Sequence, residues 1–260
     1  MSWTPSDDLA LARRLAASAA EVTLTYWRQA PREWRKPDGS IVTEADHATE
    51  TRLRALIAEA RPADAILGEE FGPSGSGPRR WILDGIDGTR EFAEGLEAWG
   101  SLIALEVEGQ VVLGYCVEPA RHRHTWAMKG QGAFQAVGDA PPERLAVSAT
   151  ADLAAARVWV PPPHYIPDAA AQRGVDAVRA ATTASADRIY HPALAVAAGA
   201  FDAAVFYTGG PWDLAAPALI VEEAGGRFSD VRGAWTIGSG CAVYSNGRLH
   251  EPILAVLASL

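Results

Sequence analysis

The sequence predicts an α/β protein of the layered (α+β) type, and two observations predict it. Apolar residues recur at helical spacing in several stretches, of which residues 7–27 and 214–224 are the clearest. Between such stretches lie shorter runs, apolar throughout or alternating with polar residues, that are typical of strands. Because strands alternate with helices, we expect a sheet of partly parallel character that is covered by helices.

A length of 260 residues suits one large domain or two small ones, and it is enough to bury a sizeable core. The segment 138–143 contains Pro141-Pro142 and is the best candidate for a domain boundary. We therefore predict an N-terminal α+β part, residues 1–140, and a C-terminal α/β part, residues 141–260.

The chain begins with the amphipathic helix at residues 7–27. A break follows at residues 31–40, and the Pro-Asp-Gly sequence of residues 37–39 is typical of a turn. Thr43 is positioned to cap a second helix, with Asp46 three residues later in the capping-box position. Capping is therefore one explanation of Asp46.

Residues 81–90 form the stretch around which a site is expected. An apolar run predicts a short buried strand, Asp84 lies at its end, Asp87 in a turn, and Thr89 near a helix start. Free backbone N–H groups at a helix start favour an anion, and two nearby carboxylates suggest a divalent cation that bridges protein and phosphate. The alternative is an acidic surface turn with an N-cap, because Asp and Gly are common turn residues.

Four further acids lie at the ends of predicted elements, where side chains converge on a cleft. Glu69 and Glu70 close an apolar run, Asp213 precedes a helical run, and Asp46 opens another. Taken singly, each acid is more typical of a helix cap or a solvated surface. Their significance depends on the whole pattern.

The remaining elements follow from the same patterns. A Gly-, Ser- and Pro-rich surface loop is expected at residues 71–78, and a hairpin at residues 101–117 that turns at Glu108-Gly109. Strands are also expected at residues 125–128, 133–137, 157–160, 202–207, 227–229 and 242–245, and helices at residues 169–181, 193–199 and 249–257.

Composition limits the partners and the compartment. A net charge of −9 argues against nucleic acid or an anionic membrane surface as a partner, although a bound metal can still attract a phosphate. The two cysteines, Cys116 and Cys241, lie in apolar contexts and are expected to be buried thiols. No signal peptide or membrane-length apolar span is evident, so we expect a cytoplasmic protein.

The ordered motifs resemble those of the inositol monophosphatase-like, magnesium-dependent phosphatases. They are Val42-Thr43-Glu44-Ala45-Asp46 with Lys36 ahead of it, Gly68-Glu69-Glu70, Asp84-x-Ile86-Asp87-Gly88-Thr89 and Trp212-Asp213-x-Ala215-Ala216. Resemblance to the histidinol-phosphatase branch rests on Thr89-Arg90-x-Phe92-x-x-Gly95, on residues 99–105 and on Gly130-x-Gly132-Ala133-Phe134. The motifs spread over nearly the whole chain, and the resemblance implies an αβαβα sandwich of the inositol monophosphatase and fructose-1,6-bisphosphatase type.

The resemblance also implies hydrolysis of a small phosphate monoester by a metal-activated water, with two or three Mg²⁺ ions as cofactor. Glu69, Asp84 and the backbone carbonyl of Ile86 would bind the first ion. Asp84 would be shared with a second ion, which Asp87 and Asp213 would complete. Oxygen ligands of this kind suit Mg²⁺, and two ions can clamp the attacking and leaving oxygens.

Other residues of the motifs take roles from the same resemblance. Thr89 and Glu69 would hold the nucleophilic water, and the backbone N–H groups of Gly88 and Thr89 would bind the phosphate. Asp46 would lie near a third, loosely held ion and the Thr89 hydroxyl.

Further residues are expected around these ligands. Glu70 would lie behind them, and Arg90 and Phe206 would contact the substrate. Lys36 resembles a mobile-loop lysine that closes over the site and contacts the substrate; the alternative is a solvated surface lysine.

Three positions depart from the family pattern and leave the substrate open. Gly85 stands where the family usually has Pro, which makes the metal loop more flexible. Phe206 stands seven residues before Asp213, where both branches typically carry a Glu that contacts the substrate. The Gly-Asp pair that the histidinol branch usually has near residues 189–192 is missing.

Histidinol phosphate is therefore the first substrate to test, and it would make the protein a cytoplasmic, homodimeric enzyme of histidine biosynthesis. An inositol phosphate, a sugar phosphate or a nucleotide 3′-phosphate is the alternative. A second alternative is a non-catalytic protein of this fold that binds a phosphorylated ligand. A third is a zinc-dependent hydrolase that uses His122 and His124, although a solvated pair explains these two residues better in the absence of further ligands.

Overall fold

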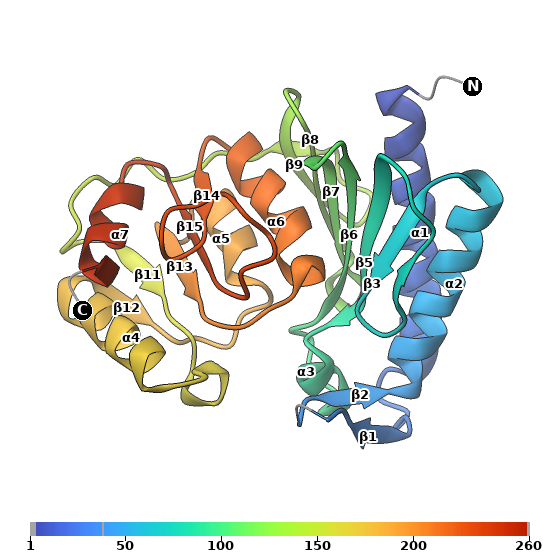
Figure 1. Cartoon of the computed structure of the whole chain (residues 1–260), viewed down its shortest axis with the longest axis horizontal. Helices are drawn as coiled ribbons and strands as arrows, with labels where there is room; N and C mark the ends of the chain where they lie inside the picture. The colour runs from blue at the N-terminus through green and yellow to red at the C-terminus, as the bar shows by residue number, and fades with distance from the viewer. Residues whose placement is uncertain (1–3, 38, 259–260) are drawn as a thin grey trace.

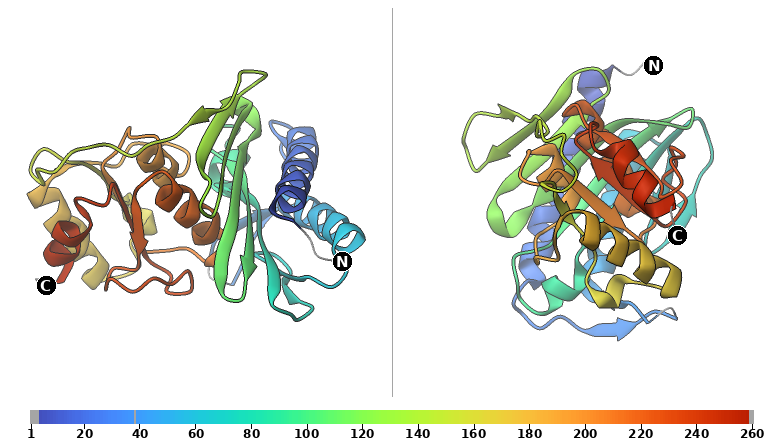
Figure 2. Two further views of the ribbon diagram at one scale, coloured as in Figure 1. Left: turned by 90° about the horizontal axis from the view of Figure 1, so that it is seen from above. Right: turned by 90° about the vertical axis from the view of Figure 1, so that its left-hand side faces the viewer.

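The structure is a computed structural model that describes residues 4–37 and 39–258, and it has five layers (Figure 1). Two helices cover one face of a large sheet, two shorter helices lie between this sheet and a smaller one, and two more helices cover the outer face of the smaller sheet (Figures 1 and 2). The predicted αβαβα sandwich is therefore confirmed. The helices, in layer order, are α1 (Pro5–Tyr26) with α2 (Glu44–Ala60), α5 (Pro192–Ala197) with α6 (Pro211–Glu223), and α4 (Ala169–Ala181) with α7 (His250–Ala258).

The large sheet has eight strands in the order β10-β9-β8-β7-β6-β5-β3-β4, and all neighbours are antiparallel except β3 and β5. The hairpin predicted around Glu108-Gly109 is β6–β7. The strands are β3 (Ala65–Gly68), β4 (Gly72–Ser74), β5 (Arg79–Asp87), β6 (Gly100–Val107), β7 (Gln110–Glu118), β8 (Arg123–Met128), β9 (Gly132–Val137) and β10 (Glu143–Arg144).

The small sheet has five strands in the order β12-β11-β13-β15-β14. Its first three strands are parallel and its last three antiparallel, so the expected parallel character holds for half of it. A crossover through α4 joins the parallel pair β11 and β12, as parallel pairing requires. The strands are β11 (Arg157–Trp159), β12 (Thr183–Ser185), β13 (Ala203–Phe206), β14 (Arg227–Ser229) and β15 (Ala242–Ser245).

Some segments are more ordered than the sequence indicates. Residues 31–40 were expected to be a break, but β1 (Glu33–Arg35) pairs there with β2 (Ile41–Thr43) as a hairpin; Asp38 of the predicted turn lies outside the described residues. The expected loop at residues 71–78 contains the edge strand β4. Short strands of this kind are stabilised by pairing with a neighbour rather than by local preference. The remaining short elements are α3 (Thr89–Ala93) and two 3₁₀ turns, Pro119–Arg121 and Pro163–Tyr165.

Helix α6 is central to the packing because it is buried between the two sheets. Eight consecutive residues from Leu214 to Val221 are buried, which is the pattern expected of a helix with apolar neighbours on all sides. It approaches β7 closely, since a Cβ at Gly114 would lie 2.6 Å from the carbonyl oxygen of Ala216. This contact brings the start of α6, from the C-terminal half, to the large sheet.

Two further findings concern composition. Cys116 is buried as expected, but the prediction was wrong for Cys241, which is partly exposed just before β15. Within residues 4–37 and 39–258, no helix combines the length and the apolarity that a membrane crossing needs.

Candidate active site

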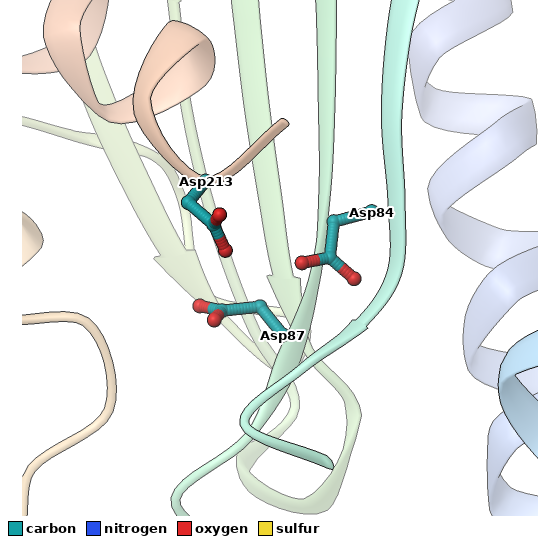
Figure 3. A group of neighbouring side chains, drawn as sticks. All are labelled: Asp84, Asp87 and Asp213. Carbon is teal, nitrogen blue, oxygen red and sulfur yellow. The ribbon is translucent and has the colours of Figure 1, made fainter. Parts of the chain in front are cut away.

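Three aspartates from two distant segments converge beside the start of α6. Asp84 and Asp87 belong to β5, Asp213 belongs to the first turn of α6, and one carboxylate oxygen of each lies within 4.8 Å of the others. Figure 3 shows the three carboxylates turned toward one another. Among the described residues, no other group of three His, Cys, Asp or Glu side chains has this geometry.

An irregularity in β5 explains how two residues three positions apart share one side of a strand. In a regular strand, positions i and i+3 point to opposite faces. Here the pairing with β6 shifts between Asp84, which faces Leu102, and Asp87, which faces Gly100. A shift of this kind re-aims a side chain. The sequence prediction of a strand that ends at Asp84 was therefore too short, because β6 pairs with β5 up to Asp87.

Gly85 lies within this irregularity and is packed against α2. A Cβ there would lie 3.2 Å from the carbonyl oxygen of Asp46, and the Gly85 carbonyl accepts a 2.7 Å hydrogen bond from the buried Ser101 hydroxyl. These contacts with α2 and with Ser101 restrict the backbone flexibility that glycine would otherwise give to this position.

Burial makes the three aspartates unfavourable as bare anions. Burial raises the pKa of Asp84, and the charges of Glu69, Asp87 and Asp213 raise it further. For the same main reason, burial, the pKa of Asp87 rises to about 7 and that of Asp213 also rises. Asp84 Oδ1 is buried and has no hydrogen-bond partner. A hard divalent cation fits such a group, because buried carboxylates are stable when they are paired or bind a metal.

Glu69 lies close to this group but is held by Lys36. Its backbone N–H donates to the Leu83 carbonyl at 3.2 Å, which fixes it beside β5. Lys36 Nζ, just after β1, donates to Glu69 Oε1 and Glu70 Oε1, each at 2.7 Å. Burial disfavours the ammonium, but these bonds and charges outweigh it and raise the pKa of Lys36. Lys36 therefore lies at the site as a paired residue rather than in solvent.

A buried glutamate that sequence reasoning missed, Glu50, holds the backbone just after Glu69 in place. Glu50 of α2 accepts hydrogen bonds from the backbone N–H groups of Glu70, at 2.7 Å, and Phe71, at 3.3 Å, and from Arg54 Nε at 2.6 Å. A Cβ at Gly68 would lie 2.0 Å from Glu50 Oε1, so only glycine fits there. The available signal was the Glu–Arg pair at i, i+4, which usually marks only an exposed helix face.

Replacing Arg54 with alanine should destabilise the protein, because Glu50 loses its buried ion-pair partner. Arg54→Ala removes the cation beside Glu50 and leaves a buried charge without its partner, so the free energy of unfolding should fall by about 3 kcal/mol. Urea unfolding followed by circular dichroism measures this change. Arg14→Ala, on the exposed face of α1, is the matched control and should change it by less than ~0.5 kcal/mol. Equal values for the two variants would show that Glu50 does not depend on Arg54.

Asp46 forms the predicted capping box with one carboxylate oxygen and contacts the Thr89 hydroxyl with the other. Asp46 Oδ2 accepts the Thr43 backbone N–H at 2.8 Å and the Thr43 hydroxyl at 2.6 Å, which is the predicted capping box. Asp46 Oδ1 lies 3.1 Å from the Thr89 hydroxyl, which is also 3.0 Å from the Ile86 carbonyl oxygen. Burial raises the pKa of Asp46 to about 6. One carboxylate therefore joins the start of α2 to the start of α3.

The start of α3 requires glycine. Gly88 has a φ of +83°, and a Cβ there would lie 2.9 Å from the Ala98 carbonyl oxygen. This places the backbone of Gly88 and Thr89 directly after Asp87. Arg90 follows in α3 near Tyr165; burial raises the pKa of Tyr165 to about 12, and Arg90 opposes part of that rise.

A cleft of about 180 Å³ runs from Asp87, Gly88 and Asp213 toward the small sheet. Phe206 and residues 189–192, two of the three departures from the family pattern, line it together with residues that sequence reasoning did not connect to the site. The aromatic and apolar residues of the lining include Trp159, Pro161, Pro162, Tyr165, Ile189, Tyr190, His191, Phe206 and Tyr207.

The ring nitrogens of His124 and His191 contact other groups of the fold. His124 Nδ1 lies 3.0 Å from the Tyr115 hydroxyl, and neither His124 nor His122 belongs to a metal-capable group among the described residues. His191 is buried, and burial lowers its pKa to about 4.

The chain is similar to known proteins over nearly its whole length. The inositol monophosphatase family profile matches residues 5–260. A histidinol-phosphatase of Mycobacterium tuberculosis is 38% identical over 96% of this chain and 98% of its own length, and one of Chlorobaculum parvum is 39% identical over 97% of each. Among solved structures, an IMPase of Thermotoga maritima is similar, with a TM-score of 0.85, 28% identity and 97% of each chain covered. The chain belongs to the inositol monophosphatase family.

Proposed function

We propose that this protein hydrolyses a small phosphate monoester with the help of Mg²⁺. The observation that carries the proposal is the group of Asp84, Asp87 and Asp213, whose carboxylate oxygens lie within 4.8 Å of one another, with Asp84 Oδ1 buried and unpartnered. Such a group is stable in its charged form when a cation shares it.

The ligand sets follow the family resemblance. Glu69, Asp84 and the Ile86 carbonyl would hold one ion, Asp84 with Asp87 and Asp213 a second, and Asp46 would lie near a third. When bound, the ions supply positive charge to the phosphate and lower the pKa of a water molecule.

The chain's own residues then orient the reactants. Since Asp46 Oδ1 can accept the Thr89 hydroxyl proton, a lone pair of Thr89 is left to accept a hydrogen bond from the attacking water. Glu69 would accept the second water proton, and Lys36, at 2.7 Å, would balance its charge. The backbone N–H groups of Gly88 and Thr89 would bind phosphate oxygens.

Histidinol phosphate is the substrate we propose first, because relatives 38–39% identical over nearly the whole chain carry the name histidinol-phosphatase. Inositol phosphate, sugar phosphates and nucleotide 3′-phosphates are the alternatives. A phosphate-release assay of these compounds tests the proposal, with each compound measured once with about 5 mM Mg²⁺ and once with EDTA. We expect release only with Mg²⁺ and fastest from histidinol phosphate; equal rates for all compounds would remove histidinol phosphate as the preferred substrate.

Two rival functions make different predictions. A non-catalytic binding protein would release no phosphate and would be unaffected by Asp84→Asn. A zinc-dependent hydrolase would lose activity on His122→Ala and would be insensitive to Mg²⁺. The bond between His124 and Tyr115 does not favour the zinc alternative.

The proposal also covers the pathway, the compartment and the oligomeric state of the protein. A histidinol-phosphatase activity would belong to histidine biosynthesis, and a cytoplasmic homodimer is the expected form. Sedimentation velocity measures the mass of the particle in solution. A mass of 27.6 kDa, that of one chain, would contradict the proposal of a dimer.

A further inference from the structure

The cleft has an aromatic wall, defined here as Trp159, His191 and Phe206. The Phe206 ring lies between the other two: its centroid is 5.1 Å from Trp159, at an interplanar angle of 32°, and 5.5 Å from His191, at 28°. All three residues line the cleft that begins at Asp87 and Asp213. A substrate whose phosphate lies at the aspartates therefore places its leaving group toward this wall.

The polar atoms of the wall are used inside the protein. Trp159 Nε1 donates to the Asp187 carbonyl at 3.0 Å, and His191 Nε2 donates to the Asp213 carbonyl at 3.1 Å. Because a carbonyl only accepts, His191 carries the proton of this hydrogen bond on Nε2. Its Nδ1 is also shielded from solvent. The wall thus presents mainly carbon to the cleft.

The tyrosines that line the cleft also use their hydroxyls in contacts with the protein, as Tyr165 does in a hydrogen bond with Arg90. The Tyr190 hydroxyl donates to the Asp87 carboxylate and accepts a 3.6 Å hydrogen bond from Cys116 Sγ, and a Cβ at Gly100 would lie 2.7 Å from it. The Tyr207 hydroxyl packs on α4, where a Cβ at Gly174 would lie 1.8 Å from it. The lining also contains charged side chains, of which Arg188 and Glu91 pair with each other at 3.5 Å.

This arrangement favours one class of leaving group over another. A hydroxyl placed against the wall gives up its water partners and finds none in return, which weakens binding by roughly tenfold for each such hydroxyl. A planar ring loses no hydrogen bonds across its faces and packs on other rings in offset or edge-to-face geometry. Rings are therefore selected, and polyols are rejected.

We propose that the physiological leaving group is an alcohol that carries an aromatic or heteroaromatic ring, packed on the aromatic wall, with Phe206 as the main specificity-determining residue. The inference rests on the proposed phosphatase function and goes further, because it excludes polyol phosphates such as inositol phosphate as good substrates.

The test compares kcat/KM, with Mg²⁺, for 2-phenylethyl phosphate, ethyl phosphate, histidinol phosphate and inositol 1-phosphate. We expect the two ring-bearing esters to exceed ethyl phosphate by about tenfold or more, and inositol 1-phosphate not to exceed it. Phe206→Leu should reduce the ratio of 2-phenylethyl to ethyl phosphate by about fivefold, mainly through KM. Phe201→Leu, the same change in the same core but outside the cleft lining, should leave the ratio unchanged.

The outcomes separate the inference from the function it rests on. If inositol 1-phosphate is cleaved as well as the phenylethyl ester, or if Phe206→Leu leaves the ratio intact, the aromatic wall does not select the substrate although the phosphatase function stands. If no ester is cleaved, the phosphatase function fails and the inference fails with it. The wild-type ratios decide the matter even if Phe206→Leu does not fold.

Discussion

Asp84→Asn should lower phosphate release by about 10³-fold or more, the largest effect of any single change considered. Asp84 is the one carboxylate assigned to both ions, and it is buried near the charges of Glu69, Asp87 and Asp213. An amide has the same shape but no charge to share with a cation. The same substitution removes one of several mutually repelling charges, so the metal-free variant should melt at a higher temperature than metal-free wild type.

This pair of opposite effects distinguishes a metal site from a structural one. Thermal melting with EDTA and with Mg²⁺ should show a large Mg²⁺-dependent increase for wild type and a small one for Asp84→Asn. Asp139→Asn, in an exposed turn, is the control and should keep wild-type activity and the wild-type response to Mg²⁺. Full activity of Asp84→Asn, or an unchanged Mg²⁺ response, would contradict the assignment of Asp84.

The second large effect concerns the metal-free protein at different pH. Burial raises the pKa of Asp87 and of Glu70 to about 7 each, against ~4 for the unfolded chain. The folded state therefore binds protons that the unfolded state has released. This contribution to stability is complete below about pH 4 and is lost as the pH rises through about 7. In EDTA, the melting temperature should fall by roughly 5 °C or more between about pH 6.5 and 8.5.

Magnesium should largely remove this fall, because the bound cation favours the charged carboxylates. The buried histidines do not contribute to the fall in melting temperature over this pH range. Burial lowers the pKa of His191 and His250 to about 4, so their contribution is lost only as the pH falls below about 6.5. Asp84→Asn should show a shallower fall than wild type in EDTA. A melting temperature that stays constant or rises over this range would show that the acids do not carry raised pKa values in the fold.

Much of the fold follows from local patterns. The helices α1, α4 and α6 match the predicted apolar periodicity to within a few residues, and the Thr43–Asp46 capping box starts α2 as expected. Local signals suffice here because helix spacing and caps act over three or four residues. The order of the acidic motifs likewise pointed to the family, and the family profile over residues 5–260 confirms that resemblance.

The candidate site depended on contacts that no local pattern carries. The full length of β5 was missed because its last residues pair with β6 rather than follow an apolar run. Glu50 was missed because its partners include the backbone of Glu70 and Phe71, twenty and more positions away. Residues 189–192 were noted in the sequence only as a departure from the family pattern, and the place of His191 in the cleft depends on its contacts with Phe206 and Asp213.

The sequence by itself determined the layered fold class, most of the helices and strands, and the family of acidic motifs. The family motifs also implied that Asp213 would share an ion with Asp84 and Asp87. Tertiary structure alone decided that Lys36 pairs with both Glu69 and Glu70, and that the Phe206 ring packs on Trp159 and His191. The physical reason is range: periodicity, caps and turns are set by neighbours along the chain. Buried charge and ring packing are set by residues that become neighbours only when α6 packs between the two sheets.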